Sequence, residues 1–164
     1  PYFCYADSIN MLNRAIEFIT KNEQESIVLA TKIANEIKPN DILTFSGDLG
    51  AGKTFFCREI IKVLCGQNTR VISPTFNLLQ TYEANKCTIY HFDLYRLEHI
   101  SEIYELGIEE ALEGNICLIE WPKLINQILP KDTIHIDISI IDQNTRKILC
   151  IFADDSGKRL DDLD

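Results

Sequence analysis

One stretch, residues 47–54, limits what this chain can fold into more than any other feature. It reads Gly-x-x-x-x-Gly-Lys-Thr, which is the Walker A pattern of a loop that wraps around phosphate groups. The apolar run 41–45 before it is typical of a strand, and apolar residues recur at helical spacing over 53–65 after it. This succession predicts a strand, a phosphate-binding loop and a helix, and therefore favours an α/β nucleotide-binding domain.

The residue types of this loop suit separate tasks. Glycine lets the backbone turn so that successive N–H groups point inward at phosphate oxygens, and the helix that follows adds its positive end. We expect Lys53 to contact the β- and γ-phosphates and the Thr54 hydroxyl to bind Mg²⁺. The residues expected to hold the nucleotide in this loop are Asp48, Leu49, Gly50, Ala51, Gly52, Lys53 and Thr54.

The chain has 164 residues and a net charge of −9. That length suggests one domain, and an acidic chain without a basic run disfavours direct binding of nucleic acid. The 6 cysteines include no Cys-x-x-Cys pair, which favours buried, reduced thiols over disulfides or a metal cluster. No stretch resembles a transmembrane helix or a signal peptide, so we expect a cytoplasmic protein that does not contact a membrane.

We expect the domain that carries the phosphate-binding loop to span residues 15–153. Residues 1–14 would form an N-terminal extension, and a native start at Met11, the only methionine, is a hypothesis that intact-mass measurement tests. Residues 154–164 are rich in aspartate and are expected to be a solvated acidic tail.

Periodicity over the rest of the chain predicts strands that alternate with helices and then a terminal hairpin. The expected strands are 15–19, 41–45, 71–72, 77–82, 87–92, 116–119, 133–140 and 147–152, and the expected helices are 23–37, 53–65, 101–113 with a break near Gly107, and 122–128. We expected 133–140, which alternates strictly, to be a half-exposed antiparallel strand. The fold class is therefore a three-layer α/β/α domain with a mixed, centrally parallel sheet and a C-terminal antiparallel hairpin, which is a P-loop NTPase architecture.

Two acidic residues follow apolar strands and are candidates for the metal and water chemistry of such a site. Asp93 comes after 90–92, and Glu120 comes after 116–119. Either carboxylate can hold Mg²⁺ or orient the attacking water, and the sequence leaves the two roles open. Thr75 lies about twenty residues after the loop, where nucleotide switches often keep a hydroxyl that senses the γ-phosphate.

Further residues near these motifs have ordinary interpretations beside the functional ones. His91 shares a strand face with Asp93, but a single strand histidine is more often structural than a catalytic base. Trp121 follows Glu120 at a strand end and is expected near the ligand. The segment 85–88 lacks the aspartate of the guanine-specific Asn-Lys-x-Asp pattern, which favours ATP over GTP. The arginines that can neutralise phosphate charge or simply lie on the surface are Arg58, Arg70 and Arg96.

Four motifs occur together in an order and spacing that resemble one family. They are the loop at 47–54, Ser-Pro-Thr-Phe at 73–76, His-Phe-Asp-Leu-Tyr-Arg-Leu at 91–97 and Ile-Glu-Trp-Pro at 119–122. The combination resembles the TsaE (YjeE) family, the ATPase component of bacterial tRNA threonylcarbamoyladenosine synthesis, and the resemblance covers about 15–153. The loop is a generic motif, whereas the other motifs in combination with it are specific.

The resemblance implies an ATPase that binds ATP or ADP with Mg²⁺ and acts on the transferase TsaD and its partner TsaB. The resemblance implies that the ATPase resets the complex so that modification of adenosine 37 continues. The acidic composition indicates that tRNA is held by the partners rather than by this chain. The resemblance implies Thr54, Glu120 and Asp93 at the metal, Thr75 in a switch-like loop and Trp121 beside the nucleotide. Lys123 departs from the family pattern, which often has glutamate there.

Two other functions fit a Walker A chain. A small-molecule kinase would need an acceptor pocket and usually an arginine-rich lid, and the sequence has no such segment. A nucleotide-gated binding module would need no hydrolysis, so a hydrolysis-dead Glu120 variant that still supports the modification would indicate it. No arginine can be placed in the sequence as a finger in cis, so we expect slow hydrolysis that partners accelerate.

Overall fold

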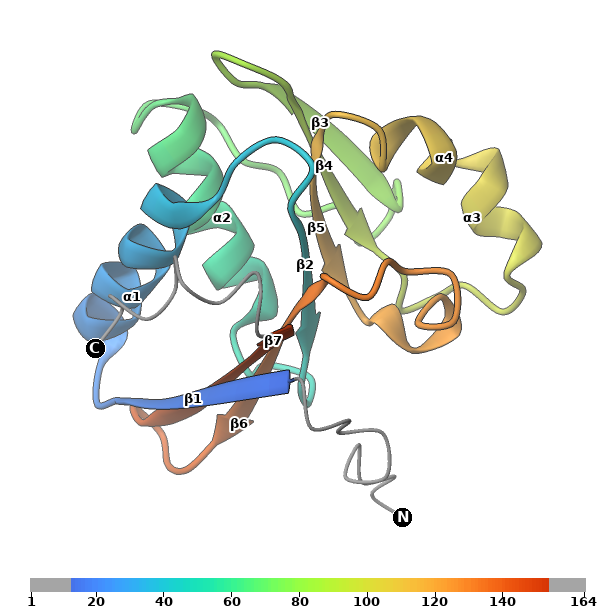
Figure 1. The fold of residues 1–164 in the computed structure, drawn as a ribbon. Coiled ribbons are helices and arrows are strands. Elements are labelled where there is room, and N and C mark those ends of the chain that lie inside the picture. Colours follow the sequence, from blue (N-terminus) through green and yellow to red (C-terminus); the bar gives the residue numbers. More distant parts are fainter. Residues whose placement is uncertain (1–12, 154–164) are drawn as a thin grey trace.

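Seven strands form one mixed sheet in the order β1-β7-β6-β2-β5-β4-β3 (Figure 1). The computed structural model describes residues 13–153. The strands are β1 (Asn13–Thr20), β2 (Ile42–Ser46), β3 (Leu79–Glu83), β4 (Thr88–Asp93), β5 (Ile116–Glu120), β6 (Ile134–Ile140) and β7 (Arg146–Ala153).

The four central strands β6, β2, β5 and β4 run parallel to one another. Antiparallel pairs complete the sheet at both edges, with β1 and β7 beside β6 and with β3 beside β4. The predicted mixed sheet with a parallel centre is confirmed. Because the central strands are parallel, their carboxyl ends meet at one edge, where a ligand site of this architecture is expected.

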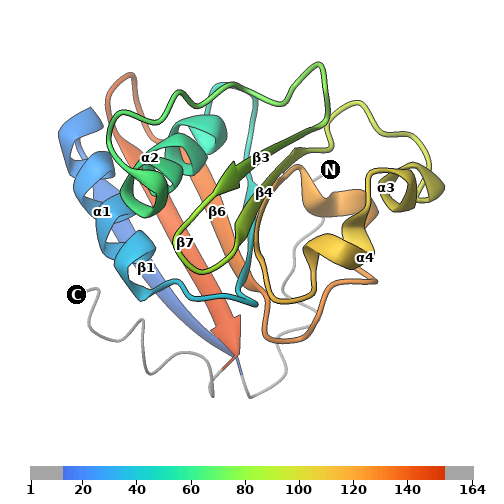
Figure 2. The ribbon, with the colours of Figure 1, turned by 90° about the horizontal axis from the view of Figure 1, so that it is seen from above.

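Helices cover both faces of this sheet (Figure 2). The helices α1 and α2 pack together on one face, and α3, α4 and the short 3-10 helix η2 lie on the other. Each face has its own apolar core, which makes the three layers that were predicted. The bounds are α1 (Glu23–Glu36), α2 (Lys53–Cys65), α3 (Ser101–Glu105), α4 (Ile108–Ala111) and η2 (Pro122–Leu124).

The alternation of side chains in β2 shows how the strands supply both cores. Leu43 and Phe45 belong to the core under α1 and α2, whereas Ile42 belongs to the core under α3 and α4, because successive strand residues point to opposite faces. The same alternation in β5 places Leu118 on the α2 side. Glu120, two residues later, therefore points to the face that α2 covers.

Local signals set several element ends. The Asn22 side chain accepts a hydrogen bond from the Glu25 amide at 2.9 Å and caps α1. Gly107 has φ +81° and separates α3 from α4, which confirms the predicted break. The strand β3 begins at Leu79 rather than at 77, because Leu78 has φ +66° and does not continue an extended strand.

Three sequence predictions were wrong in part. The segment 71–72 is not a strand, because the backbone of Ile72 exchanges hydrogen bonds with the Tyr82 hydroxyl instead of a neighbouring strand. The predicted helix 122–128 is only the single turn η2, followed by further turns. The strand predicted as antiparallel over 133–140 pairs antiparallel with β7 but parallel with β2, so β6 joins the terminal hairpin to the parallel centre.

Some predictions concern the ends of the chain or its environment. The hypothesis of a start at Met11 and the acidic tail 154–164 lie outside the described residues, as does the extension 1–14 apart from residues 13 and 14, which begin β1. Within residues 13–153 the cysteines are free thiols. Over the same residues no helix is long and apolar enough to cross a membrane.

Candidate nucleotide-binding site

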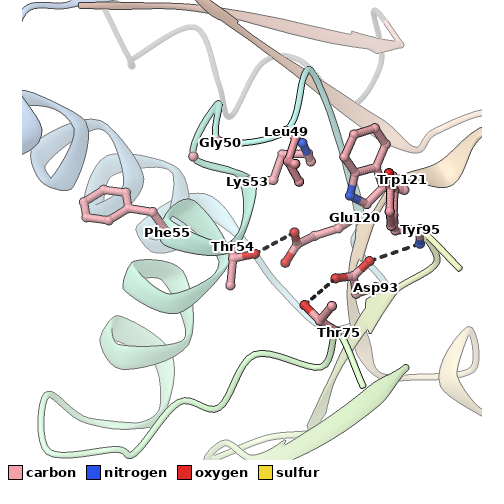
Figure 3. A pocket seen from close by; sticks show the side chains of 11 residues that line it. Leu49, Gly50, Lys53, Thr54, Phe55, Thr75, Asp93, Tyr95, Glu120 and Trp121 are labelled. Carbon is pink, nitrogen blue, oxygen red and sulfur yellow. Dashed lines mark hydrogen bonds between the residues drawn. The ribbon is translucent and has the colours of Figure 1, made fainter. Parts of the chain in front are cut away.

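A cavity of about 230 Å³ lies where the loop 47–54 meets the carboxyl ends of β4 and β5 (Figure 3). Nine of the eleven residues that the sequence predicted for the site line this cavity. Tyr95 and Phe55 also line it and were not predicted. The lining residues are Leu49, Gly50, Gly52, Lys53, Thr54, Phe55, Thr75, Asp93, Tyr95, Glu120 and Trp121.

The loop has the backbone that its glycines permit. Gly47, Gly50 and Gly52 have φ values of +131°, +78° and +114°, in the region that favours glycine. A Cβ on Gly50 or Gly52 would meet no atom within 4 Å, so open space lies beside these two glycines. The helix α2 begins at Lys53, and the N–H groups of its first turn have no partner within the helix. These N–H groups are therefore available as donors to phosphate oxygens.

Lys53 begins α2 and lines the cavity. Its Nζ donates hydrogen bonds of 2.7 Å to the carbonyls of Gly47 and Asp48 and lies 3.8 Å from the ring centroid of Trp121. Burial lowers the pKa of Lys53, and the nearby carboxylates Glu120 and Asp93 partly oppose that shift. A buried cation is therefore kept close to the loop, where a phosphate group can compete for it.

Asp48 and Ala51 are the two predicted residues that do not line the cavity. The Asp48 carbonyl holds Lys53. Ala51 is buried, and its carbonyl accepts a hydrogen bond of 3.1 Å from Arg146 Nε. Asp48 and Ala51 therefore contribute to the site through hydrogen bonds to their backbone carbonyls rather than through their side chains.

Glu120 connects the loop to the sheet. Its Oε2 accepts a hydrogen bond of 2.8 Å from the Thr54 hydroxyl, as Figure 3 shows. Its Oε1 lies 2.8 Å from His91 Nε2, and both side chains are buried. The sequence predicted Glu120 and Thr54 near the metal, but the contact between His91 and Glu120 was missed. The sequence feature that could have revealed this contact is the strand face that His91 shares with Asp93.

Asp93 forms a second polar cluster beside the first. Its Oδ2 accepts a hydrogen bond of 2.9 Å from the Thr75 hydroxyl, and its Oδ1 accepts one of 3.1 Å from the Tyr95 amide. The hydroxyls of Thr75 and Ser73 are 2.8 Å apart. The segment around Thr75 is thus tied to the end of β4.

Trp121 covers one side of the cavity and has an unusual backbone. Its φ is +57°, in the left-handed region, which costs an ordinary residue about 1–3 kcal/mol and is common at functional sites. The Trp121 amide donates a hydrogen bond of 3.1 Å to the Phe45 carbonyl, and the chain turns directly after this bond. The indole ring is 4.8 Å from the Tyr95 ring, so the two aromatic rings form one wall of the cavity.

The arginines suggested by the sequence lie elsewhere. Arg58, Arg70 and Arg96 do not line this cavity. Arg96 donates hydrogen bonds of 2.7 Å to the carbonyls of Thr75 and Phe76, so it braces the segment that carries Thr75. Among the described residues that line the cavity, Lys53 is the only cation.

A second hollow of about 290 Å³ lies beside the loop and was not predicted. It shares Gly52 and Phe55 with the first cavity. The side chains around it come from the start of α1, from the loop and from the turn before β7. The lining residues are Asn22, Glu23, Ser26, Ala51, Gly52, Phe55, Phe56, Gln143, Asn144 and Arg146. Sequence reasoning missed it because its lining comes from three segments that are far apart in the chain, 22–26, 51–56 and 143–146.

The donors around Thr54 suit a hard cation. One hydroxyl and two carboxylates, those of Thr54, Glu120 and Asp93, line the same cavity, and oxygen donors of this kind are what Mg²⁺ prefers beside phosphates. A different combination, Cys57 with His91 and Glu120, places three possible metal-binding atoms within 4.8 Å of one another. Burial raises the pKa of the Cys57 thiol well above its usual value, which disfavours the thiolate that metals bind.

Comparisons with known proteins agree with these motifs. Residues 20–148 match the family model described as "Threonylcarbamoyl adenosine biosynthesis protein TsaE". The tRNA threonylcarbamoyladenosine biosynthesis protein TsaE of Rickettsia felis is 55% identical over 140 residues, which cover 85% of this chain and 81% of that protein. The protein of the same name from Bacillus subtilis is 38% identical over 136 residues, which cover 82% of this chain and 84% of that protein.

A solved structure resembles the fold as well. The crystal structure of Bacillus subtilis YdiB matches with a TM-score of 0.77 and 29% identity, over 93% of this chain and 95% of that one. The family model covers well over half of this chain, and the resemblance seen in the motifs is confirmed. The chain therefore belongs to the TsaE family of tRNA threonylcarbamoyladenosine biosynthesis proteins.

Proposed function

We propose that this chain binds ATP with Mg²⁺ between the loop, β4 and β5 and hydrolyses it to sustain turnover of a TsaD–TsaB complex. The observation that carries the proposal is the hydrogen bond of 2.8 Å from the Thr54 hydroxyl to Glu120. It brings the Walker A hydroxyl to a carboxylate at the end of the neighbouring strand, which is the pairing that a Mg-nucleotide site needs.

The two hollows on either side of Gly52 suggest where the parts of the nucleotide lie. The phosphates fit the cavity with Lys53 and the open side of the loop. The base and ribose fit the second hollow, which offers the amide side chains of Asn22 and Asn144 and the ring of Phe55. A preformed concave site with a few polar groups is the usual form of a small-molecule pocket.

The two carboxylate clusters suggest a division of labour. Glu120 is bonded to Thr54, so we assign it to the metal side of the site. Asp93 is bonded to Thr75, so we assign it to the side of the γ-phosphate and the attacking water. Bound Mg²⁺ would neutralise and orient the phosphate oxygens. Lys53 would hold the same oxygens by charge-assisted hydrogen bonds.

The charges of the site support slow hydrolysis that partners accelerate. Among the described residues around the cavity Lys53 is the only cation, and Arg96 and Arg146 are bonded to backbone carbonyls. An arginine finger typically contributes ~10³–10⁵ in rate, so a partner that supplies one would have a large effect. The net charge of −9 further supports tRNA being held by the partners rather than by this chain.

The test is phosphate release from ATP by this chain alone and then with the TsaB–TsaD pair. We expect slow release alone, stimulation by the pair, and loss of both with Lys53→Ala. That variant should also bind ATP about ten- to hundred-fold more weakly, because charge-assisted hydrogen bonds to phosphate are lost. Turnover that is equal with and without the pair would contradict the partner-dependent mechanism, and ATP affinity unchanged by Lys53→Ala would contradict the assigned role of Lys53.

A further inference from the structure

Both oxygens of the Glu120 carboxylate have a protein partner, and the partner of Oε1 is His91. The Nε2 atom of His91 lies 2.8 Å from Oε1, and the exposed fractions of the two side chains are 0% and 2%. The contact crosses from β4 to β5, where His91 is paired with Leu118 and Asp93 with Glu120. It therefore links two adjacent parallel strands in the most buried part of the site.

The direction of this hydrogen bond follows from its surroundings. An ionised carboxylate only accepts hydrogen bonds, and Oε2 already accepts one from Thr54. The Nδ1 atom of His91 is buried without a partner among the described residues. A proton on Nδ1 would leave a buried donor unsatisfied and would turn the lone pair of Nε2 toward the carboxylate, and both are unfavourable. The ring therefore carries its proton on Nε2 and donates it to Glu120.

The two partners of Glu120 differ in how firmly they are held. Thr54 belongs to the first turn of α2, directly after the loop, and its hydroxyl is also the group expected at the metal. His91 is fixed in the middle of a strand between two other strands. The histidine is thus the partner that can keep Oε1 in place while the other end of the carboxylate exchanges contacts.

We propose that His91 is a positioning residue, which holds the Glu120 carboxylate in the orientation that the Mg-nucleotide site needs. The inference rests on the proposed function and adds to it a residue that does not line the cavity. Without the His91 donor, Oε1 would be buried without a partner, and the carboxylate would turn toward whatever donor it can reach. We expect the loss to appear in hydrolysis and in the dependence on Mg²⁺ rather than in binding of the nucleotide itself.

The test compares His91→Leu, which removes the donor at similar size, with His91→Gln, whose amide can replace Nε2. Cys57→Ala is the matched control, because Cys57 is equally buried and lies within 4.8 Å of the same two groups. We expect His91→Leu to lower kcat about ten- to hundred-fold and to change KM for ATP less than about threefold. His91→Gln should restore most of kcat, and Cys57→Ala should lower the melting temperature but leave kcat near that of the parent protein.

A second readout needs no hydrolysis. ADP affinity is measured by calorimetry with and without Mg²⁺. We expect His91→Leu to raise the Mg²⁺ concentration for half-maximal binding, with the Mg-free affinity for ADP unchanged. If His91→Leu does not fold, His91→Asn takes its place, because its amide is one methylene too short to reach Oε1. In a Glu120→Ala background, which leaves His91 no carboxylate to hold, removal of the His91 donor should cost no further activity.

Each outcome decides the inference. A lower melting temperature with unchanged kcat and unchanged Mg²⁺ dependence would make His91 merely structural and would overturn it. Equal kcat in His91→Gln and His91→Asn, or additive losses in the Glu120→Ala background, would also overturn it. If the parent protein binds Mg-ADP but releases no phosphate, the proposed hydrolysis fails while the Mg²⁺ titration still decides the role of His91. If the parent protein binds no nucleotide, both proposals are overturned.

Discussion

Replacing Gly47 by alanine should destabilise the fold far more than the same change at Gly50. A Cβ on Gly47 would lie 2.2 Å from the backbone oxygen of Ile138 in β6. Cβ atoms essentially never come within 3.0 Å of such an atom, so the loop at Gly47 and β6 would have to separate by about 0.8 Å. Gly50 has the same need for a positive φ, but a Cβ there would meet nothing within 4 Å.

The expected sizes follow from these two terms. At Gly50 only the left-handed backbone is penalised, at about 1–2 kcal/mol. At Gly47 backbone strain of about 1–3 kcal/mol adds to overpacking of about 1–3 kcal/mol, so the loss is about 2–6 kcal/mol. With a urea dependence of about 2 kcal/mol per molar, the midpoint of unfolding should fall by roughly 1–3 M for Gly47→Ala and by less than about 1 M for Gly50→Ala.

Urea denaturation followed by circular dichroism measures both variants on one scale. Equal midpoints for the two variants would refute the argument, because they would show that the close approach of the loop to Ile138 does not affect the free energy of unfolding. A Gly47→Ala protein that is as stable as the parent would refute it outright. The comparison is internal, since both changes add one methyl group to the same loop.

Three further predictions concern single side chains. Trp121 is the only tryptophan and lies 3.8 Å from Lys53 Nζ, so its fluorescence should change when ADP binds; a constant signal at saturation would place the nucleotide elsewhere. Glu120→Ala should lower phosphate release by about 10²-fold or more, because the carboxylate on the metal side of the site is lost, and ADP affinity much less, and equal losses would make Glu120 a binding ligand only. Burial lowers the pKa of His135, so the fold binds its proton less readily than the unfolded chain does, and stability should fall as pH drops through the usual value of 6.5. His135→Asn, whose amide can still reach Thr44, should flatten that dependence in melting curves, and an unchanged profile would show that other groups cause it.

Much of the fold could be predicted because local and long-range signals agree. The loop 47–54 fixes a strand and a helix on either side, and the apolar run 116–119 has the composition of a strand that is buried on both faces. Acids at the ends of such strands, Asp93 and Glu120, must then reach the same edge of a parallel sheet. That is why the cavity could be predicted from residues that are far apart in the chain.

What could not be predicted depends on contacts that no short pattern encodes. Ile72 looks like a strand residue, but its backbone pairs with the hydroxyl of Tyr82. Trp121 turns over Lys53 only because its backbone adopts a positive φ, which the sequence Glu-Trp-Pro does not demand. Arg146 supports the loop from β7 through the carbonyl of Ala51, a contact across the sheet that becomes visible only when the order of the strands is known.

The polar groups of the cavity are bonded to one another, and this affects what binding can gain. Lys53 holds two carbonyls of its own loop, Thr54 holds Glu120, and Thr75 holds Asp93. A nucleotide must therefore exchange these hydrogen bonds rather than simply add new ones. Each exchange contributes only the difference in free energy between the old and the new hydrogen bond. The loss of ATP affinity on Lys53→Ala should therefore be nearer to about tenfold than to hundred-fold.

The same exchange would explain the proposed dependence on partners. In the proposed mechanism the Thr75 hydroxyl faces the γ-phosphate, but in the structure that hydroxyl donates to Asp93, and Arg96 holds the segment through the carbonyls of Thr75 and Phe76. Phe76 itself is 84% exposed, so a partner can contact this segment directly. A protein that binds there and moves the segment by a small amount would change the position of Thr75 without altering the loop that holds the phosphates, which separates acceleration of hydrolysis from affinity for ATP.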